Sequence, residues 1–495
     1  MSLADQYPVT LTNSLSGKKE KFEPLIPGYV GLYACGPTVY NYVHLGNVRT
    51  FLTFDTVTRY FRFLGYKVRY VRNITDVGHL ENDADEGEDK IAKRARLEQL
   101  EPMEVVKRYT EDFHSVMRQF NILPPSIEPT ATGHIIEQIE IIQNLIGKGL
   151  AYEVNGSVYF DVKKYNQHDH YGILSGRNID ELLESGRDLD SQDEKREKID
   201  FALWKKASPV HIMRWPSPWG DGFPGWHIEC TVMSTKYLGE TFDIHGGGMD
   251  LKFPHHECEI AQAKGASGKD PVKYWLHSNM LTVNGQKMSK SLGNSFLPAE
   301  LFAGTHKLLD RGYSPMTVRF FMLQSHYSST LDFSNEALSA AEKGFKKLMA
   351  SLATIKAMTI AGGAKADDEN LNKLVDECYR CMSDDFNTAR TLAVLFEMSS
   401  RINDLKNGNI SASPHTFEKF KSTYIGFMED VLGLKEETTG DDHLLDGTIK
   451  VLIELRKKAR TDRNYALSDR IRDDLKAIGI QLKDGKDGEI TYTIE

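Results

Sequence analysis

The segment from Tyr29 to Leu64 constrains the fold of this chain more than any other. A strand-like run, Tyr29–Ala34, precedes the turn sequence His44-Leu45-Gly46-Asn47, and a helix-like run, Arg49–Leu64, follows it. A glycine turn between a strand and a helix presents backbone N–H groups and the positive end of the helix dipole to an anion. The pattern predicts half of a nucleotide-binding α/β fold, although an ordinary packed histidine beside a turn glycine has the same spacing.

A second signature lies much further along the chain, in the unbroken sequence Lys287-Met288-Ser289-Lys290-Ser291. Gly285 precedes it and Gly293 follows it. Lysines and serines on a glycine-flanked loop form a cationic, hydrogen-bonding clamp that suits a polyphosphate. A solvated basic loop is the alternative interpretation.

Together and in this order, the two signatures resemble those of the class I aminoacyl-tRNA synthetases. Three further segments are similar to cysteinyl-tRNA synthetases. They are Tyr33–Tyr40 (YACGPTVY), Pro224–Cys230 (PGWHIEC) and Gly246–Glu259 (GGGMDLKFPHHECE). The resemblance covers nearly the whole chain, from Pro8 to the basic C-terminal tail.

The resemblance implies the catalytic and ATP-binding residues. His44 and Lys290 would stabilise the phosphates of ATP while a cysteine carboxylate attacks the α-phosphorus, Lys287 would assist, and Mg²⁺ would accompany ATP. The implied ATP-binding residues are His44, Gly46, Asn47, Lys287, Ser289 and Lys290. The turn departs from the family's HIGH sequence at two positions. Leu45 conserves the volume of isoleucine, whereas Asn47 lacks a titratable group, so no proton transfer is assigned to it.

Four residues are candidate metal ligands. His255 and Glu259 lie four apart in the helix-like segment Phe253–Lys264, so they share one face and can either bind a metal or form a surface pair. No spacing rule joins Cys35 and Cys230 to them, and taken alone each is better suited to packing as a small hydrophobe than to metal binding. The resemblance joins the four, because the family binds zinc with cysteines at these two positions, this histidine and this glutamate.

Zinc would also explain the choice of substrate. Zinc prefers thiolate sulfur to a hydroxyl, so coordination of the substrate side chain would separate cysteine from serine, which a hydrophobic pocket does poorly. By resemblance, Gly36, Thr75 and Trp226 bind the amino acid. From the sequence alone, Thr75 also suits a turn or cap, and Trp226 a packed core.

The remaining cysteines are expected to pack. Cys258 stands where the family commonly has asparagine and flanks the helix face of His255, but the four matched positions already fill a zinc shell. Cys378 and Cys381 form a C-x-x-C within helical periodicity, with no βαβ pattern around them.

Composition indicates a soluble globular protein. The chain has 495 residues, a net charge of −9 and only five cysteines. Its length suggests about three domains. The odd, small number of cysteines argues against a secreted disulfide framework. Neither a transmembrane run nor a signal-peptide core is found. We therefore expect a cytoplasmic protein with no membrane partner, and a monomer.

The expected architecture is α/β: a Rossmann-type nucleotide-binding domain with an insertion, then a helical bundle and a small C-terminal domain, which the resemblance implies to be anticodon-binding. Between Lys450 and Arg472, eight lysines and arginines stand against three acidic residues, which suits either RNA or a solvated helix face. The expected boundaries are 20–129 (first catalytic half), 130–225 (connective insertion), 226–300 (second catalytic half), 301–434 (stem-contact and helical bundle), 435–447 (linker) and 448–495 (anticodon binding).

Three functions are compatible with these features. The leading hypothesis is a ligase that joins L-cysteine, activated with ATP, to cysteine tRNA. The second is a related ligase that joins cysteine to an amino sugar through the same adenylate; the basic tail argues against it. The third is a non-catalytic, zinc-containing RNA-binding protein, which the intact KMSKS disfavours.

Overall fold

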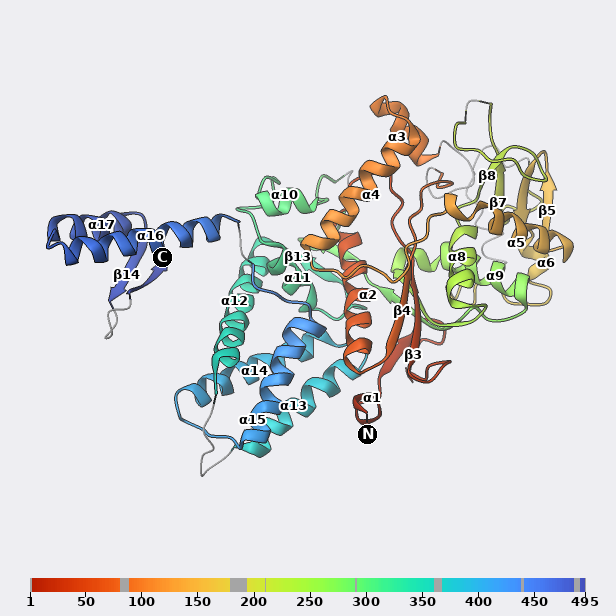
Figure 1. Ribbon diagram of the computed structural model, residues 1–495. Coiled ribbons are helices and arrows are strands. Elements are labelled where there is room, and N and C mark those ends of the chain that lie inside the picture. The colour runs from red at the N-terminus through yellow and green to blue at the C-terminus, as the bar shows by residue number, and fades with distance from the viewer. Residues whose placement is uncertain are drawn as a thin grey trace. The chain divides into compact units, whose positions relative to one another are not determined.

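The computed structural model describes most of the chain and is drawn in Figure 1. The described residues are 2–80, 89–178, 194–209, 211–289, 292–359, 367–437, 440–484 and 490–494. The expected catalytic residue Lys290 lies outside these ranges. The chain divides into two compact units, Met1–Lys435 and Glu436–Glu495.

A four-stranded parallel sheet forms the centre of the first unit, with strand order β10-β9-β3-β4. Helix α2 connects β3 to β4, and α9 connects β9 to β10. The bounds are β3 Tyr29–Ala34, β4 Lys67–Arg72, β9 Phe242–Gly248, β10 Val272–Ser278, α2 Leu45–Phe63, α8 Ile228–Leu238, η3 Met249–Lys252 and α9 His255–Ser267. The two halves diverge from the β3–β9 pair, so the carboxyl ends of this pair are the switch point where open α/β sheets bind ligands.

A buried ion cluster fastens the middle of α2 to the rest of the unit. Asp55 accepts hydrogen bonds from Arg59 Nε at 2.8 Å and from Arg319 Nη2 at 2.7 Å. Arg319 is fully buried and also donates to the carbonyl of Leu432 at 2.8 Å. Each of these charges therefore has a partner of opposite sign, which offsets much of the cost of burying it.

The insertion lies in the sequence between the two halves of the parallel sheet and adds a second, antiparallel sheet. Its strand order is β5-β6-β7-β8, and helix α5 begins this segment. The bounds are η2 Thr132–His134, α5 Ile135–Gly147, β5 Ala151–Val154, β6 Ser157–Phe160, α6 Val162–Tyr165, β7 Phe201–Lys206 and β8 Gly222–Pro224. Its core of Val158, Phe160, Leu203 and Trp204 is continuous with residues of α8 and α9, so the insertion packs on the helices that carry site residues.

A three-stranded sheet carries the beginning of KMSKS. Strand β11 (Leu281–Val283) lies in the middle, antiparallel to β12 (Gln286–Lys287) and parallel to β13 (Leu331–Phe333). The other elements of the first unit are the N-terminal elements, the two helices after the β4 segment, and the helices that follow residue 297. Their bounds are α1 Leu3–Gln6, β1 Thr10–Asn13, β2 Lys18–Lys21, α3 Lys90–Glu98, α4 Pro102–Gln119, α10 Pro298–Ala303, α11 Pro315–Leu323, α12 Asn335–Ala357, α13 Asp368–Ser383, α14 Thr388–Lys406, α15 Pro414–Gly426 and the π-helical turn η4 Phe427–Val431.

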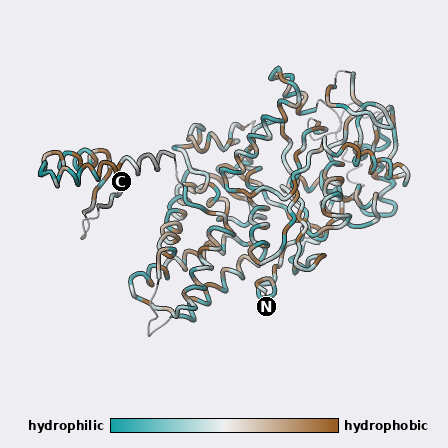
Figure 2. The backbone as a smooth tube through the Cα atoms, viewed as in Figure 1, coloured by the Kyte–Doolittle hydropathy of each residue, from teal (hydrophilic) through white to brown (hydrophobic). Residues whose placement is uncertain are grey.

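The bundle helices bury one face each, and Figure 2 shows apolar and polar residues alternating along them. On α13 the buried positions include Leu371, Val375, Cys378 and Met382, spaced at one helical turn. Cys378 Sγ lies 3.5 Å from Met398 Sδ, and Cys381 is buried as well. Both cysteines are free thiols, in agreement with the expectation that this C-x-x-C serves packing.

The second unit consists of two helices and a hairpin. The bounds are α16 Gly440–Thr461, α17 Tyr465–Ala477, β14 Ile480–Asp484 and β15 Ile490–Ile494, and the strands pair antiparallel as expected. The segment 435–447, expected to be a linker, is helical from Gly440 onwards. Polar composition does not stop a helix whose next turns are anchored, here by buried Ile449 and Ile453. In the described part of the chain, none of the helices has both the length and the apolar character needed to cross a bilayer.

Candidate functional site

The four candidate metal ligands converge at the carboxyl edge of the parallel sheet. Cys35 directly follows β3, Cys230 lies in the first turn of α8, and His255 and Glu259 lie on the first turns of α9. Each is at most 5% exposed. One ligand atom from each lies within 4.8 Å of the others. The fold thus unites two cysteines that no spacing rule could join to the helical pair.

The distances suit a shared cation. Cys35 Sγ lies 3.7 Å from Cys230 Sγ and 3.6 Å from Glu259 Oε1, while His255 Nε2 lies 3.1 Å from the same carboxylate oxygen. A tetrahedral ion with metal–sulfur bonds of about 2.3 Å places two sulfurs roughly 3.8 Å apart. Two sulfurs, one imidazole nitrogen and one carboxylate oxygen form a donor set that can hold a divalent metal ion.

The protonation of these groups is set by their neighbours. Burial raises the pKa of the Cys230 thiol, but its hydrogen bonds with Cys35 and His255 outweigh burial and bring the pKa to about 6. Burial lowers the pKa of His255, but hydrogen bonds to Cys230 and Glu259 outweigh burial and raise it to about 10. Burial, reinforced by Cys230, raises the pKa of Cys35 well above its ordinary value. The cluster therefore favours a Cys230 thiolate beside a protonated His255.

A second, overlapping set of ligands was not predicted from the sequence. His245 and His256 form a group with Cys35 and Glu259, and one ligand atom from each lies within 4.8 Å of the others. His245 Nε2 lies 2.8 Å from Glu259 Oε2, and His256 Nε2 lies 3.2 Å from Cys35 Sγ. The available signals were the histidine just before the glycine run Gly246–Gly248 and the His-His pair that begins α9.

Cys258 does not belong to either set. It is buried, and its Sγ lies 3.4 Å from the Tyr171 hydroxyl. Among the described residues, neither of the two ligand sets at this edge includes Cys258. This position agrees with the expectation that Cys258 packs.

The residues expected to bind the amino acid surround the cluster. Trp226 is half-buried, with its ring stacked on His79 at 4.0 Å and tilted against His255 at 4.4 Å. Thr75 is buried, and its hydroxyl accepts a hydrogen bond from Asn73 Nδ2 at 3.1 Å. The Thr75 hydroxyl in turn donates to Glu229, a buried carboxyl group whose role no sequence pattern indicated.

Gly36 lies where no side chain fits. A Cβ at this position would come 1.6 Å from the carbonyl oxygen of Asn73. The Gly36 N–H donates to Asn73 Oδ1 at 2.8 Å. Glycine therefore permits the close approach of the β3 and β4 ends, and its contact with substrate stays a prediction.

The turn His44–Asn47 caps helix α2. His44 Nδ1 accepts a hydrogen bond from the Asn47 N–H at 3.4 Å, and Asn47 Oδ1 accepts one from the His44 N–H at 3.4 Å. This reciprocal capping places the proton of a neutral His44 ring on Nε2, as a hydrogen-bond donor. Asn47 thus caps the start of α2 together with His44.

The two signatures meet in the folded chain. A Cβ on Gly46 would lie 3.1 Å from the ring of His44 and 3.2 Å from the Met288 methyl group. Asn294 supports the loop from behind: its Oδ1 accepts from the Ser289 N–H at 2.8 Å and its Nδ2 donates to the Lys287 carbonyl at 3.2 Å. The Lys287 side chain is exposed. The turn and the described part of KMSKS therefore form one surface beside the start of α2.

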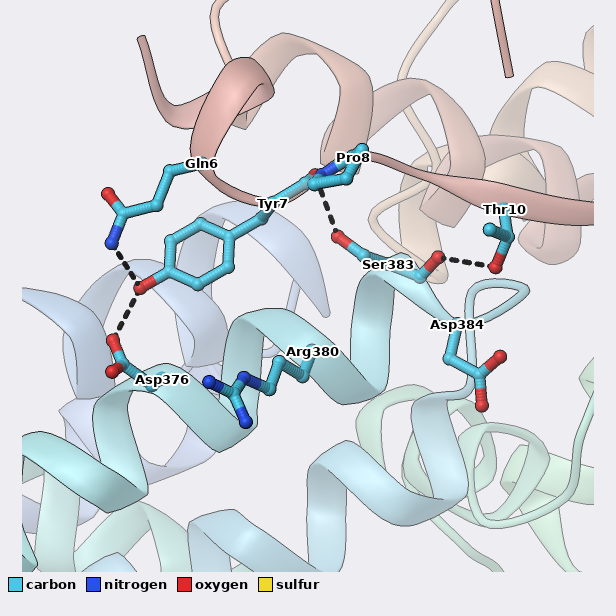
Figure 3. A pocket seen from close by; sticks show the side chains of 8 residues that line it. All are labelled: Gln6, Tyr7, Pro8, Thr10, Asp376, Arg380, Ser383 and Asp384. Atoms are coloured by element: carbon cyan, nitrogen blue, oxygen red, sulfur yellow. Dashed lines mark hydrogen bonds between the residues drawn. The ribbon is translucent and has the colours of Figure 1, made fainter. Parts of the chain in front are cut away.

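A pocket of about 380 Å³ lies elsewhere, between the N-terminal segment and helix α13 (Figure 3). Its hydrogen bonds fasten these two segments together: Tyr7 Oη donates to Asp376 at 2.5 Å, and Ser383 Oγ donates to the Tyr7 carbonyl at 3.1 Å. The pocket contains none of the expected site residues. Site chemistry, rather than pocket size, therefore locates the candidate active site.

Comparison with known proteins agrees with this arrangement. Residues 21–343 match the tRNA synthetases class I (C) catalytic domain, and residues 377–436 match the DALR domain. The chain is 56% identical to a cysteine–tRNA ligase of Bacteroides thetaiotaomicron and 54% identical to that of Porphyromonas gingivalis, with 98% of the chain covered in each case and 98% and 99% of the relatives. A cysteine–tRNA ligase of Chlorobium chlorochromatii is 47% identical, with 97% of the chain and 98% of the relative covered.

Solved structures support the fold. A Mycobacterium tuberculosis methionyl-tRNA synthetase in complex with methionyl-adenylate superposes with a TM-score of 0.56 at 15% identity, covering 81% of this chain and 89% of that one. A putative arginyl-tRNA synthetase of Campylobacter jejuni gives 0.53 at 14% identity, covering 83% and 93%. The expected Rossmann-type fold is confirmed. The chain therefore belongs to the class I aminoacyl-tRNA synthetases and, within them, to the cysteine–tRNA ligase family.

Proposed function

We propose that this chain activates L-cysteine with ATP and transfers it to the 3′ end of cysteine tRNA. The carrying observation is the buried cluster of Cys35, Cys230, His255 and Glu259 at the sheet edge. Its donor set and its 3.7 Å sulfur–sulfur distance fit a tetrahedral zinc ion. A bound zinc ion supplies a preference for thiolate sulfur over hydroxyl oxygen.

The chain's own residues account for the rest of the activation step. A cysteine carboxylate oxygen attacks the α-phosphorus of ATP, and pyrophosphate leaves, so no general base is needed. His44, through Nε2–H, and Lys287, through its ammonium group, would donate to the phosphates, with Lys290 as the third donor and Mg²⁺ bound to ATP. Gly46, Asn47 and Ser289 would complete the ATP site. Trp226, which lies against His255, would cover the substrate side chain.

The transfer step needs only the adenylate and the tRNA. A terminal ribose hydroxyl attacks the acyl carbon, and AMP leaves. All five cysteines are free thiols, which suits a reducing compartment, and we include a cytoplasmic location in the proposal. We also keep the expectation of a monomer.

Pyrophosphate exchange tests the activation step. We expect exchange that depends on cysteine, with serine at least about a hundredfold less effective, since the discrimination exceeds what packing achieves. Zinc content measured on the same sample should be close to one ion per chain. Full exchange in a zinc-free preparation would contradict the role of the metal, and acylation of an amino sugar instead of cysteine tRNA would identify the other ligase.

We further propose that the second unit, Glu436–Glu495, reads the anticodon region of the tRNA. The support is its separate fold and its exposed cations, Lys450, Lys458, Arg460 and Arg463. Deletion after Leu445 should leave pyrophosphate exchange within about twofold and lower tRNA charging by at least roughly tenfold, because only the second step needs this surface. Undiminished charging would refute the assignment.

A further inference from the structure

Arg49 is a buried cation with an unusual set of partners. It lies on α2, five residues after His44, and is only 2% exposed. Its Nη1 donates to the Met280 carbonyl at 2.6 Å, and its Nη2 donates to the carbonyls of His326, at 3.3 Å, and Ser329. Within the described ranges, Arg49 forms no ion pair with a carboxylate.

Two other buried arginines, by contrast, each have a carboxylate partner. Arg319 has Asp55 as its partner and Arg72 has Glu128. Burial lowers the pKa of Arg49 to about 10, so the guanidinium stays charged at neutral pH. Burial of a charge that only carbonyl oxygens solvate costs stability, and such a residue points to a role other than packing.

The three carbonyls mark the start of the sheet that carries KMSKS. Met280 directly precedes β11, and Ser329 lies two residues before β13. These strands pair in parallel, with Leu281 beside Leu331. Strand β11 also pairs with β12, which places Thr282 opposite Lys287. The Arg49 guanidinium therefore links helix α2, which His44 caps, to the segments just before strands β11 and β13. Both strands belong to the sheet that carries Lys287.

The loop that supplies two of these carbonyls is itself held in place. His326 Nε2 lies 2.8 Å from the Asp385 carbonyl oxygen, and the Tyr327 hydroxyl donates to Asp385 Oδ1 at 2.7 Å. The Asn279 N–H donates to the Tyr327 carbonyl at 2.8 Å. Asp385 and Phe386 both adopt left-handed backbone conformations, with φ of 61° and 52°, which is costly for phenylalanine. The guanidinium thus binds a fixed support rather than a free loop.

We propose that Arg49 is a positioning residue that sets the register between the His44 turn and the strand of Lys287, so that both reach the same triphosphate. The inference rests on the proposed function. Arg49 is not assigned a contact with ATP: it acts through the carbonyls of Met280 and Ser329. Positioning of this kind matters because small displacements of catalytic groups cost large factors in rate.

A double-mutant cycle in cysteine-dependent pyrophosphate exchange tests the proposal. Arg49→Met keeps the length of the side chain and removes every donor. We expect kcat to fall by at least about tenfold while KM for cysteine and the zinc content change by less than about twofold, since only the phosphate end is displaced. In a Lys287→Ala background, Arg49→Met should lower kcat by a factor at least about fivefold smaller than in the wild-type background. Part of what Arg49 positions is already missing there.

Two further variants control the experiment. Arg62→Met makes the same change on the exposed end of α2 and should leave exchange unchanged. Arg49→Lys keeps a charge and some donors, and should recover part of kcat. If Arg49→Met does not fold, as judged by the loss of a cooperative thermal transition, the cycle is run with Arg49→Lys.

The outcomes separate this inference from the proposed function. An equal loss from the Arg49 substitution in both backgrounds would show a general structural role and overturn the inference. A parallel loss of cysteine affinity and zinc would do the same. Wild-type protein without cysteine-dependent exchange would instead refute the proposed function. Coupling with Lys287 at unchanged KM for cysteine is the result that supports positioning.

Discussion

The metal cluster and the nucleotide end of this site are built in opposite ways. Cys35, Cys230, His255 and Glu259 are all buried, and the two cysteines belong to an apolar core cluster. Lys287, by contrast, is exposed on a two-residue strand. Under the proposed function, selection between cysteine and serine would depend on fixed ligand distances, whereas a triphosphate would need charged groups that meet it from solvent. The difference teaches that, under this proposal, buried residues would set substrate choice and exposed residues would contact the phosphates.

The two ends also differ in what holds them. At the cluster, the functional side chains contact one another directly, as the 3.1 Å distance between His255 and Glu259 shows. At the nucleotide end, side chains of other residues bind backbone groups. Asn294 binds the KMSKS loop, and Arg49 binds the base of its sheet. Substitutions should therefore abolish function at the first end and reduce it in steps at the second.

Removal of one cluster ligand should have the largest effect. Cys230→Ser keeps the volume but replaces the sulfur, and we expect exchange to fall by more than about a hundredfold together with loss of bound zinc. Metal analysis, exchange kinetics and thermal unfolding on the same sample check this. A folded variant that retains zinc and full exchange would break the contrast between the two ends.

Loss of a loop support should have an intermediate effect. Asn294→Ala removes the hydrogen bonds to the Ser289 N–H and the Lys287 carbonyl. We expect kcat for exchange to fall by roughly five- to twentyfold, with KM for cysteine unchanged, because the loop loses its position but keeps its charges. Asn407→Ala, at the end of α14, is the matched control. An effect on cysteine affinity alone would place Asn294 with the metal end instead.

Substitution of the buried cysteine beside the cluster should have the smallest effect. Cys258→Ala removes a thiol that lies against Tyr171, not within either ligand group. We expect zinc content to stay the same and exchange to change by less than about twofold, with a stability loss of about 1 kcal/mol from the lost packing. A drop in zinc stoichiometry would identify Cys258 as a further metal ligand.

The sequence determined the local parts of this site. The glycine turn after a strand predicted the start of α2, the spacing of His255 and Glu259 predicted a shared helix face, and the unbroken KMSKS indicated a phosphate contact. These features depend on neighbours a few residues apart, which periodicity reports directly. The family resemblance added the implied zinc ligands and the order of the domains.

Only the tertiary structure decided which distant residues meet. It placed Cys35 beside Cys230, brought His245 and His256 to the same edge, and set Met288 against the turn of Gly46. It also joined Arg49 to carbonyls far along the chain, where no pattern in the sequence indicated a partner. The physical reason is that such contacts follow from strand order and helix packing, which depend on the whole buried core rather than on local spacing.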